Sequence, residues 1–500
     1  MKFDNPEVFR KYTDEETFSR IKEMPTVKAM WEMCAKDYAD KVAVVDNGRE
    51  ITYAEIDKDI SALRAMLDKN GIKKGDRIGV YIPNSYEFVK AYLAVVTFGA
   101  VSVILPPQLD AMTVFGCTMK FQLSALLTVE DMDEKTAVAK AKNVKIMLLS
   151  SAGNDTFPMG DVGENDPAVV MFTGGTTGKS KGAELTNGAV MQGTVNGCYG
   201  LKYVFEQRYL NVLPFSHVFG LIRNLMTSLY TGSTIFICRN NKDMFRDIAM
   251  FRPTVMVMVP ALAEMALTLS KQFGKNMLGD DIKMVICGAA AVSPYLIEEY
   301  DKMGIMLLPG YGLTESANLV SGNPENIKKP TSVGIPYPNQ EFKIVDGELW
   351  IKGKNIMTRY IGEDISGFED GWFRTGDLVR FDEDGFLYIT GRLKEIIILA
   401  NGENISPAEV EAHFNELDFV QDSQIFEAIG DNGTHILALE VVPRMTEVKK
   451  IEGDANAFMM KELERVNLSL PSHMRAVKIT LRDKDFERTP SMKIKRYTLG

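Results

Sequence analysis

The sequence predicts an α/β protein: a large N-terminal domain of helix-covered β-sheets plus a distorted antiparallel β-barrel, then a small α+β C-terminal domain. Helical and strand-like segments alternate from Val42 to Leu308. Most of these strands are apolar on both faces, which is typical of sheets covered by helices. From about Ser332 the strands become shorter and alternate apolar with polar residues, which indicates antiparallel sheet. With 500 residues, the chain also exceeds a single typical core.

The first half of the chain repeats a unit of strand and helix. A strand pair is predicted around the turn Asn47-Gly48, and the helix after it stops at Asn70-Gly71. A buried strand and a helix capped by Gly99 come next. Further strands are predicted over 101–105, 144–150, 168–172, 254–259, 283–288 and 305–308, and a helix starts at Pro260. Several strands end in Gly-rich turns, where open α/β sheets bind their ligands.

The second half begins with the antiparallel strands EFKIV, GELWIKG, WFRTGD and GFLYITG, separated by Gly-rich turns. The pattern changes after Arg392. There the sequence predicts a strand over 394–400, a helix over 407–417, a strand pair and a long helix over 457–468. A boundary at this point gives an N-terminal domain of residues 1–392 and a C-terminal domain of residues 393–500, which is large enough for its own core.

Composition excludes several classes of protein. A net charge of −10 argues against nucleic-acid binding, which needs a basic face. The five cysteines lie far apart, without a CxxC pair or a neighbouring histidine. Zinc modules and a disulfide framework are therefore disfavoured, and buried, reduced thiols are expected. Residues 1–16 lack an apolar signal core and no apolar stretch is long enough to span a bilayer, so a cytoplasmic protein without a membrane span is predicted.

Residues 171–182, MFTGGTTGKSKG, form the motif around which the site is predicted. Glycines allow consecutive backbone N–H groups to face one concavity that binds anions, and threonine hydroxyls and lysines add donors and positive charge. This chemistry suits the phosphates of a nucleoside triphosphate. A Walker A loop would need glycine where the chain has Thr173, so that alternative fails by one position. An ordinary Gly-Thr hairpin is the other interpretation.

Four further stretches carry residues suited to nucleotide chemistry. In PGYGLTES an aromatic ring can stack on a base, a hydroxyl can bind phosphate and Glu315 can hold Mg²⁺. In RTGD, Asp377 is the type of residue that binds ribose hydroxyls. LANGENISPAEVE places Gly402 and Asn404 before a helix, and TPSMKIKR carries Lys493 in a basic loop. Taken alone, each stretch is more typical of a surface turn, a structural cap or a solvated tail.

In this order the motifs resemble those of the adenylate-forming superfamily, which contains acyl-CoA synthetases, peptide-synthetase adenylation domains and firefly luciferase. TGGTTGKSKG is similar to the family's phosphate loop, LPFSHVFG to its substrate-side motif and YGLTES to its adenine motif. GELWIKG, RTGD, GRLKEIIILANGENISPAEVE and PSMKIKR follow, so the resemblance covers nearly the whole chain and is closest to acyl-CoA synthetases. Met492 departs from the glycine that usually precedes the catalytic lysine, and Asn401 stands where some relatives have a basic residue near CoA.

The resemblance implies an enzyme that uses ATP, Mg²⁺ and CoA in two half-reactions. A carboxylate attacks the α-phosphate to give acyl-AMP and pyrophosphate, and a thiol displaces AMP after the small, mobile domain has rotated. The implied catalytic residues are Lys493, His217, Thr314 and Glu315, of which Glu315 is also the metal ligand. The implied cofactor-binding residues are Thr173, Gly174, Gly175, Thr176, Thr177, Gly178 and Lys181 at the phosphates, Tyr311 at the adenine, Gly288, Ala289, Ala290 and Gly312 at the acyl pocket, Asp377 and Arg392 at the ribose, Lys394 at the hinge, and Gly402 and Asn404 on the face used for CoA.

The residues around His217 indicate the substrate class. Phe215-Ser216-His217 lacks the acid that amino-acid-activating relatives use, so an α-amino acid is not expected. The small residues of the pocket leave room for an apolar chain, and a fatty acid is therefore predicted, with an aryl acid as the alternative. Arg223 and Asn224 on the following helix could contact a polar substituent of the acid, but a solvent-facing orientation is the favoured interpretation.

Three interpretations of the function remain open from the sequence. The partners are a small-molecule carboxylic acid and CoA in the first, and a free acyl-carrier protein replaces CoA in the second. The third is a non-catalytic acyl-AMP-binding protein. The intact set Lys181, Glu315, Asp377 and Lys493 argues against it.

Overall fold

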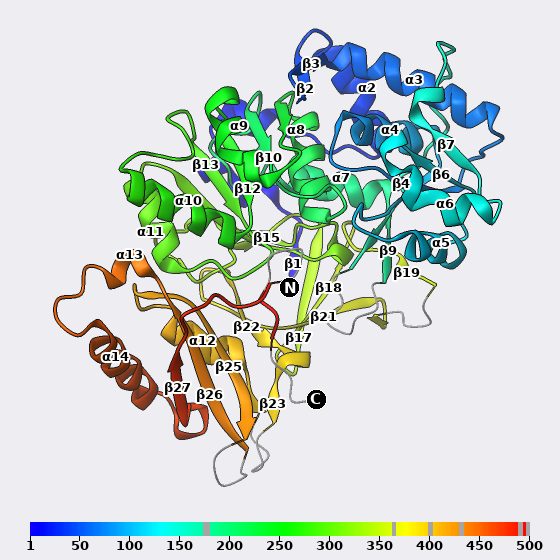
Figure 1. Ribbon diagram of the computed structural model, residues 1–500. Helices are drawn as coiled ribbons and strands as arrows, with labels where there is room; N and C mark the ends of the chain where they lie inside the picture. Colours follow the sequence, from blue (N-terminus) through cyan, green and yellow to red (C-terminus); the bar gives the residue numbers. More distant parts are fainter. Residues whose placement is uncertain (174–180, 363–366, 399–403, 430–434, 489–493, 497–500) are drawn as a thin grey trace.

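The computed structural model describes residues 1–500 except 174–180, 363–366, 399–403, 430–434, 489–493 and 497–500. Helices pack on two large sheets that form the blue-to-green part of the molecule (Figure 1). The yellow antiparallel sheet lies between this part and the orange-to-red C-terminal part. The predicted fold class is confirmed: a large N-terminal α/β part and a small C-terminal α+β part.

The first large sheet carries most of the strands that end at the candidate site. Its order is β16 (Ile335–Pro336), β15 (Ser321–Gly322), β14 (Met306–Tyr311), β13 (Met284–Cys287), β12 (Val255–Met258), β10 (Arg208–Asn211), β11 (Thr234–Ile237), β2 (Val42–Asp46) and β3 (Arg49–Thr52). The strands from β14 to β2 are parallel, and every residue of β12 and β13 is buried. The predicted hairpin of β2 and β3 is confirmed, since Asn47 and Gly48 both take the positive φ that this turn requires.

The second large sheet holds the two ends of the Gly-rich loop. Its order is β19 (Arg359–Ile361), β9 (Gly182–Thr186), β8 (Pro167–Phe172), β5 (Val101–Ile104), β4 (Arg77–Tyr81), β6 (Ala125–Thr128) and β7 (Ile146–Leu148). β8 and β9 are antiparallel and flank the loop on either side. β19 pairs with β9 from far along the chain, with Tyr360 opposite Ala183.

Helices cover the faces of both sheets (Figure 1). They are α1 (Glu15–Arg20), α2 (Val27–Asp37), α3 (Tyr53–Lys69), α4 (Tyr86–Phe98), α5 (Ala111–Lys120), α6 (Asp133–Ala141), α7 (Asn187–Asn196), α8 (Thr227–Tyr230), α9 (Met244–Phe251), α10 (Pro260–Phe273) and α11 (Pro294–Lys302). Their ends follow local chemistry. Thr52 and Glu55 form a capping box at the start of α3, and Gly99 ends α4 in the left-handed region at φ 95°.

The antiparallel sheet predicted from about Ser332 is confirmed. It consists of β1 (Lys2–Phe3), β17 (Gln340–Val345), β18 (Glu348–Gly353), β21 (Trp372–Phe381), β20 (Phe368–Glu369) and β22 (Leu387–Arg392). β1 pairs with β17, and the amino group of Met1 donates a hydrogen bond to the carbonyl of Phe342. In the pairing of β21 with β22, Asp377 lies opposite Arg392.

The C-terminal part has its own hydrophobic core, built around Phe414, Leu439 and Leu463. Its elements are β23 (Ile397–Ile398), β24 (Asn404–Ile405), α12 (Pro407–Phe414), β25 (Val420–Ile429), β26 (His435–Pro443), α13 (Met445–Val448), α14 (Ala455–Ser469) and β27 (Lys478–Leu481). This separate core supports the boundary between residues 392 and 393, which stays a prediction. The strand predicted over 394–400 is wrong in its extent: residues 393–395 form a 3₁₀ turn, and only Ile397–Ile398 among the described residues there pair as a strand.

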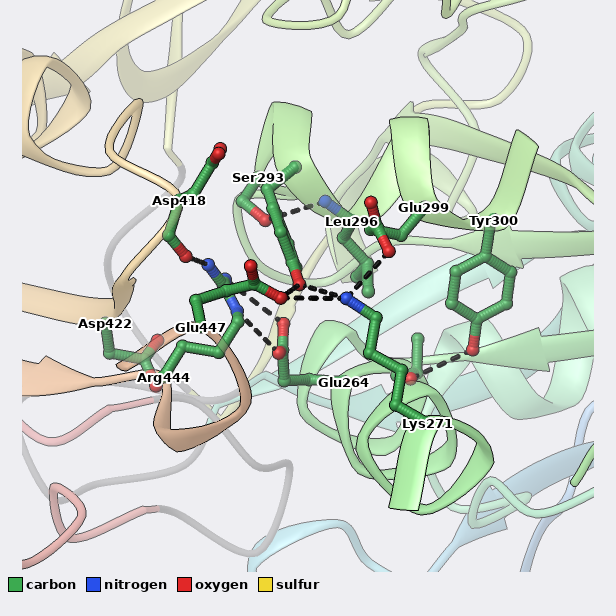
Figure 2. A network of polar contacts seen from close by, with 12 residues as sticks. Glu264, Lys271, Ser293, Leu296, Glu299, Tyr300, Asp418, Asp422, Arg444 and Glu447 are labelled. Carbon is green, nitrogen blue, oxygen red and sulfur yellow. Dashed lines mark hydrogen bonds and ion pairs between the residues drawn. The ribbon is translucent and has the colours of Figure 1, made fainter. Parts of the chain in front are cut away.

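A compact polar network joins the C-terminal part to the rest of the molecule (Figure 2). Arg444, which is only 1 % exposed, pairs with Glu264 of α10 at 2.8 Å, and its guanidinium lies 3.8 Å from the ring centroid of Tyr295 in α11. Glu447 of α13 accepts from Lys271 at 2.9 Å and from the Tyr295 hydroxyl at 2.5 Å. Arg444 and Glu447 thus hold α13 against α10 and α11 in this arrangement.

All five cysteines are buried and none forms a disulfide, as expected. Burial raises the pKa of the Cys198 and Cys238 thiols to about 12. Across the described ranges, every helix is too short or too polar to cross a bilayer. A cytoplasmic location stays a prediction.

Candidate active site

One large cavity of about 730 Å³ collects most of the predicted site residues. The ends of the parallel strands open into it, as expected for an α/β sheet: Gly288 and Ala289 follow β13, and Tyr311 ends β14. The other predicted residues on its wall are Thr173, Lys181, His217, Gly312, Thr314, Glu315, Arg392 and Lys394. Segments more than two hundred residues apart in the sequence therefore share one concave surface.

A tight turn after β14 presents Thr314 and Glu315. A Cβ atom on Gly312 would lie 1.1 Å from the carbonyl oxygen of Asn318, so only glycine fits where the backbone doubles back. The N–H of Met357 donates to the backbone carbonyl of Glu315 at 2.7 Å and anchors the turn. The Glu315 carboxylate is thereby fixed at the cavity wall. Its Oε1 accepts from the Tyr360 hydroxyl at 2.6 Å, which leaves its second oxygen to offer to a metal ion.

Asp377, Arg392 and Tyr311 form a connected group beside this turn. The Arg392 guanidinium pairs with Asp377 at 2.8 Å, and the Tyr311 hydroxyl donates to the same carboxylate at 2.5 Å. Burial and the neighbouring Asp377 charge raise the pKa of Tyr311 well above its usual value, so the hydroxyl keeps its proton. Asp377 itself does not reach the cavity wall, but it positions two residues that do. A carboxylate is an acceptor of the kind that ribose hydroxyls can donate hydrogen bonds to.

The ends of the Gly-rich loop are joined at the cavity. The Thr173 N–H donates to the carbonyl of Lys181 at 2.9 Å, and both residues line the wall. The Lys181 ammonium lies 4.7 Å from the ring centroid of Tyr360, within cation–π distance. The predicted residues Gly174, Gly175, Thr176, Thr177 and Gly178 lie outside the described residues.

Tyr360 is a site residue that the sequence reasoning missed. It contacts both Glu315 and Lys181, and it therefore links the predicted metal ligand to the predicted phosphate cation. Burial raises the pKa of its hydroxyl, and Glu315 adds to this effect. Tyr360 belongs to the sequence motif MTRYI, which precedes RTGD and could have drawn attention to it. Its place in the site, however, depends on the pairing of β19 with β9.

The acyl side of the cavity corrects one expectation. Arg223 and Asn224 were expected to face solvent, yet their exposed fractions are 2 % and 0 %. They lie in η4 (Phe219–Met226), a π-helical segment whose described residues after Phe219 are all buried, so no face of it is solvated. Arg223 lines the cavity. Ala290, by contrast, is exposed and does not line it, although Gly288 and Ala289 do.

The C-terminal part contributes Lys394 and Glu395 to the cavity wall. Asn404 lies in β24, is exposed and is not on the wall of this cavity. Gly402 and Lys493 lie outside the described residues. Arg496, three residues after Lys493, pairs with Glu411 at 2.6 Å and with Glu395 at 2.8 Å, which ties the C-terminal tail to the segment that follows Arg392.

The fold and this cavity define an enzyme site suited to a nucleotide: Glu315, Lys181 and Arg392 lie on its wall, and Asp377 pairs with Arg392 from behind the wall. Comparison with known proteins agrees. Residues 31–361 match the family described as AMP-binding enzyme. A 4-coumarate–CoA ligase-like protein of Arabidopsis thaliana is 27% identical over 88% of this chain and 85% of its own length. A long-chain-fatty-acid–CoA ligase of Salmonella typhimurium is 29% identical over 76% of this chain and 79% of its own.

Solved structures agree on the fold. An anthranilate CoA ligase in complex with anthranoyl-AMP has a TM-score of 0.83 at 18% identity, covering 94% of this chain and 95% of that one. The chain therefore belongs to the AMP-binding enzyme family of the adenylate-forming superfamily and is an AMP-forming acid–thiol ligase. The predictions of family and enzyme class are confirmed.

Proposed function

We propose that the chain activates a carboxylic acid with ATP and transfers the acyl group to CoA. The observation that supports this proposal most strongly is that Thr314, Glu315, Lys181 and Arg392 line the same cavity. In the first step a carboxylate oxygen bonds to the α-phosphorus and the bond to the bridging oxygen breaks, so pyrophosphate leaves. In the second step the CoA thiol gives up its proton, its sulfur bonds to the acyl carbon and AMP leaves, which yields the thioester.

The residues on the wall suit these steps, which require positioning and charge neutralisation more than covalent catalysis. Asp377 and Arg392 would hold the ribose, Tyr311 would flank the adenine, and Lys181 would meet the phosphates. Mg²⁺ held by Glu315 would neutralise phosphate charge, and the free oxygen of that carboxylate fits a hard cation. Tyr360, by contacting Glu315 and Lys181, would keep the two charges in place.

The same proposal assigns roles to residues that remain predictions. Thr314 would contact the α-phosphate and Lys493 would bridge the substrate carboxylate and that phosphate, with His217 gating the acyl side. Arg496 supports the role of Lys493, because its pairs with Glu411 and Glu395 fix the chain just beyond it. Lys394 lies at the start of the C-terminal part and lines the cavity, which supports a hinge there.

The acid itself is proposed to have an apolar body, fatty or aromatic. Gly288 and Ala289 add little bulk to the cavity, and Val218, Leu262 and Leu308 give it apolar wall. The relatives bear names with fatty acid, coumarate and anthranilate substrates, so they support the chemistry of the carboxylate without selecting the body.

Pyrophosphate release measured across a panel of carboxylic acids tests the proposal, with CoA or a holo acyl-carrier protein as the acceptor. We expect release with at least one acid, and thioester formation with CoA. Lys493→Ala should abolish release yet still convert supplied acyl-AMP to thioester, whereas Lys495→Ala, two residues away and exposed, should leave both steps intact. No release with any acid would refute the enzyme activity, and equal loss of both steps in Lys493→Ala would refute the role of that lysine.

A further inference from the structure

Arg223 is a buried cation without a counter-charge in the part of the chain that the structure describes. Its exposed fraction is 2 %, and neither terminal nitrogen of the guanidinium has a hydrogen-bond partner. It forms no ion pair with any described carboxylate. A guanidinium carries five N–H donors and no acceptor, so the groups that can complete its hydrogen bonds are acceptors, and anions above all.

The titratable groups close enough to Arg223 for its charge to affect their pKa values are uncharged side chains. They are the Cys198 thiol and the hydroxyls of Tyr209 and Tyr337. Burial raises the pKa of all three, and the guanidinium only partly opposes that effect. The buried Tyr209 hydroxyl faces the guanidinium, but the two do not complete a hydrogen bond within ordinary limits of distance and angle. The protein thus surrounds Arg223 with polar but uncharged atoms and leaves two neighbouring groups unsatisfied.

Such an arrangement is costly unless something completes it. A buried charge without a partner strongly destabilises a fold, and buried polar groups in proteins are nearly always hydrogen-bonded. Arg223 lies on the wall of the substrate cavity, where a ligand can supply what the protein omits. A guanidinium is planar and matches a carboxylate with two parallel hydrogen bonds, which makes an anionic ligand group the natural complement.

The reacting carboxylate is not that complement. It must lie at the phosphate-binding residues to attack ATP, and it loses its charge when the acyl-AMP forms. Lys181, at the end of the Gly-rich loop, is on the cavity wall and would neutralise the charge of the phosphates. The anion that Arg223 would bind is therefore a different group, which stays charged throughout both half-reactions.

We infer that the acid carries a second anionic group, in the simplest case a second carboxylate, which Arg223 binds while the first carboxylate is activated. The inference rests on the proposed function and narrows its substrate class from fatty or aryl acids in general to those that end in a distal carboxylate. Arg223 then acts as a specificity-determining residue, with the Tyr209 hydroxyl as a second donor to the same group.

The test compares matched pairs of acids with the full-length wild-type enzyme. Each dicarboxylic acid, straight-chain or aromatic, is paired with the monocarboxylic acid in which a methyl group replaces the distal carboxylate. We expect kcat/KM for pyrophosphate release to be roughly 100-fold higher for the best diacid than for its partner, since a site built for a charged group strongly rejects an analogue that lacks it.

Arg223→Met should abolish that preference, because methionine fills similar space without charge. It should leave the rate with monocarboxylic acids and the KM for ATP within a few-fold of wild type. Arg246→Met removes an exposed cation of α9 that is not on the cavity wall, and it should change neither acid preference nor rate. Arg223→Lys keeps the positive charge but cannot donate two parallel hydrogen bonds to one carboxylate. It should retain part of the preference for diacids.

The outcomes separate the two proposals. Release with monocarboxylic acids only, or a diacid preference that survives Arg223→Met, would overturn the inference and leave the ligase function intact. No release with any acid would overturn the ligase function and the inference with it. If Arg223→Met does not fold, the wild-type comparison of matched acids decides alone.

Discussion

The network between α13 and helices α10 and α11 rests on Glu447, and we expect Glu447→Gln to weaken this contact by about 2 kcal/mol. Burial alone would raise the pKa of Glu447, but hydrogen bonds from Lys450, Tyr295 and Lys271 outweigh it and lower the pKa to about 2, from an ordinary 4.5. That gap corresponds to about 3 kcal/mol in favour of the ionised form. Part of this energy comes from Lys450, which lies three residues after Glu447 and not across the interface, and water screens a further part, which leaves about 2 kcal/mol between the two parts of the molecule.

The consequence is a shift in how often the C-terminal part occupies this position. A loss of about 2 kcal/mol changes an equilibrium constant roughly 30-fold, so a second orientation present at 1% would rise to about a quarter of the molecules. Spin labels at Met112→Cys and Val477→Cys report the distance between the two parts. Both positions are exposed, and the five native cysteines are buried and compete poorly for the label.

Pulsed electron-resonance distances should show one main population in wild type and a second one in Glu447→Gln. Glu462→Gln provides the matched control, because it removes the same charge from an ion pair with Arg465 that lies within α14. A distance distribution in Glu447→Gln identical to that of wild type would show that the charges of this network do not hold the two parts together.

Three other outcomes are expected. Tyr360→Phe removes the hydroxyl that donates to Glu315 and should lower the rate of adenylation about tenfold, the value of one charge-assisted hydrogen bond; an unchanged rate of pyrophosphate release would contradict the positioning role. Asp377→Asn leaves Arg392 without its partner and should raise the Kd for ATP at least about tenfold by calorimetry, whereas tight binding would argue against a ribose site there. Because the pKa of Glu447 is lowered, its contribution is full above pH 4.5 and is lost as pH falls towards 2. The Tm difference between wild type and Glu447→Gln should therefore be constant above pH 4.5 and shrink below it; a change between pH 6 and 8 would contradict the assignment.

Much of this architecture was predictable because local patterns carry it. The apolar strands β12 and β13, the hairpin at Asn47-Gly48 and the cap at Gly99 follow from residue periodicity and backbone preference. The site was predictable where one turn holds several groups, as in Tyr311 to Glu315. Such features depend on neighbours in the sequence, and the sequence displays them directly.

The features that the sequence did not predict depend on contacts between distant segments of the chain. Arg223 lies in a run, LIRNLM, that looks one-sided, and only the tertiary packing of η4 shows that all of its faces are covered. Tyr360 reaches the site through the pairing of β19 with β9, which no local periodicity reveals. The apolar run after Lys394 favours a strand by composition, yet Arg496 holds Glu395 from the far end of the chain, in a 3₁₀ turn.

The pairing of β1 with β17 has a consequence for synthesis of the protein. The amino group of Met1 donates a hydrogen bond to Phe342, 341 positions later in the chain. Lys2 and Phe3 of β1 can therefore pair with β17 only after most of the chain has been made. During translation the edge of β17 that receives β1 cannot form early, and the apolar ring of Phe3 stays without its neighbours Phe342 and Phe381. The addition of β1 to this sheet is therefore a late event in synthesis, because the strand has to wait for β17.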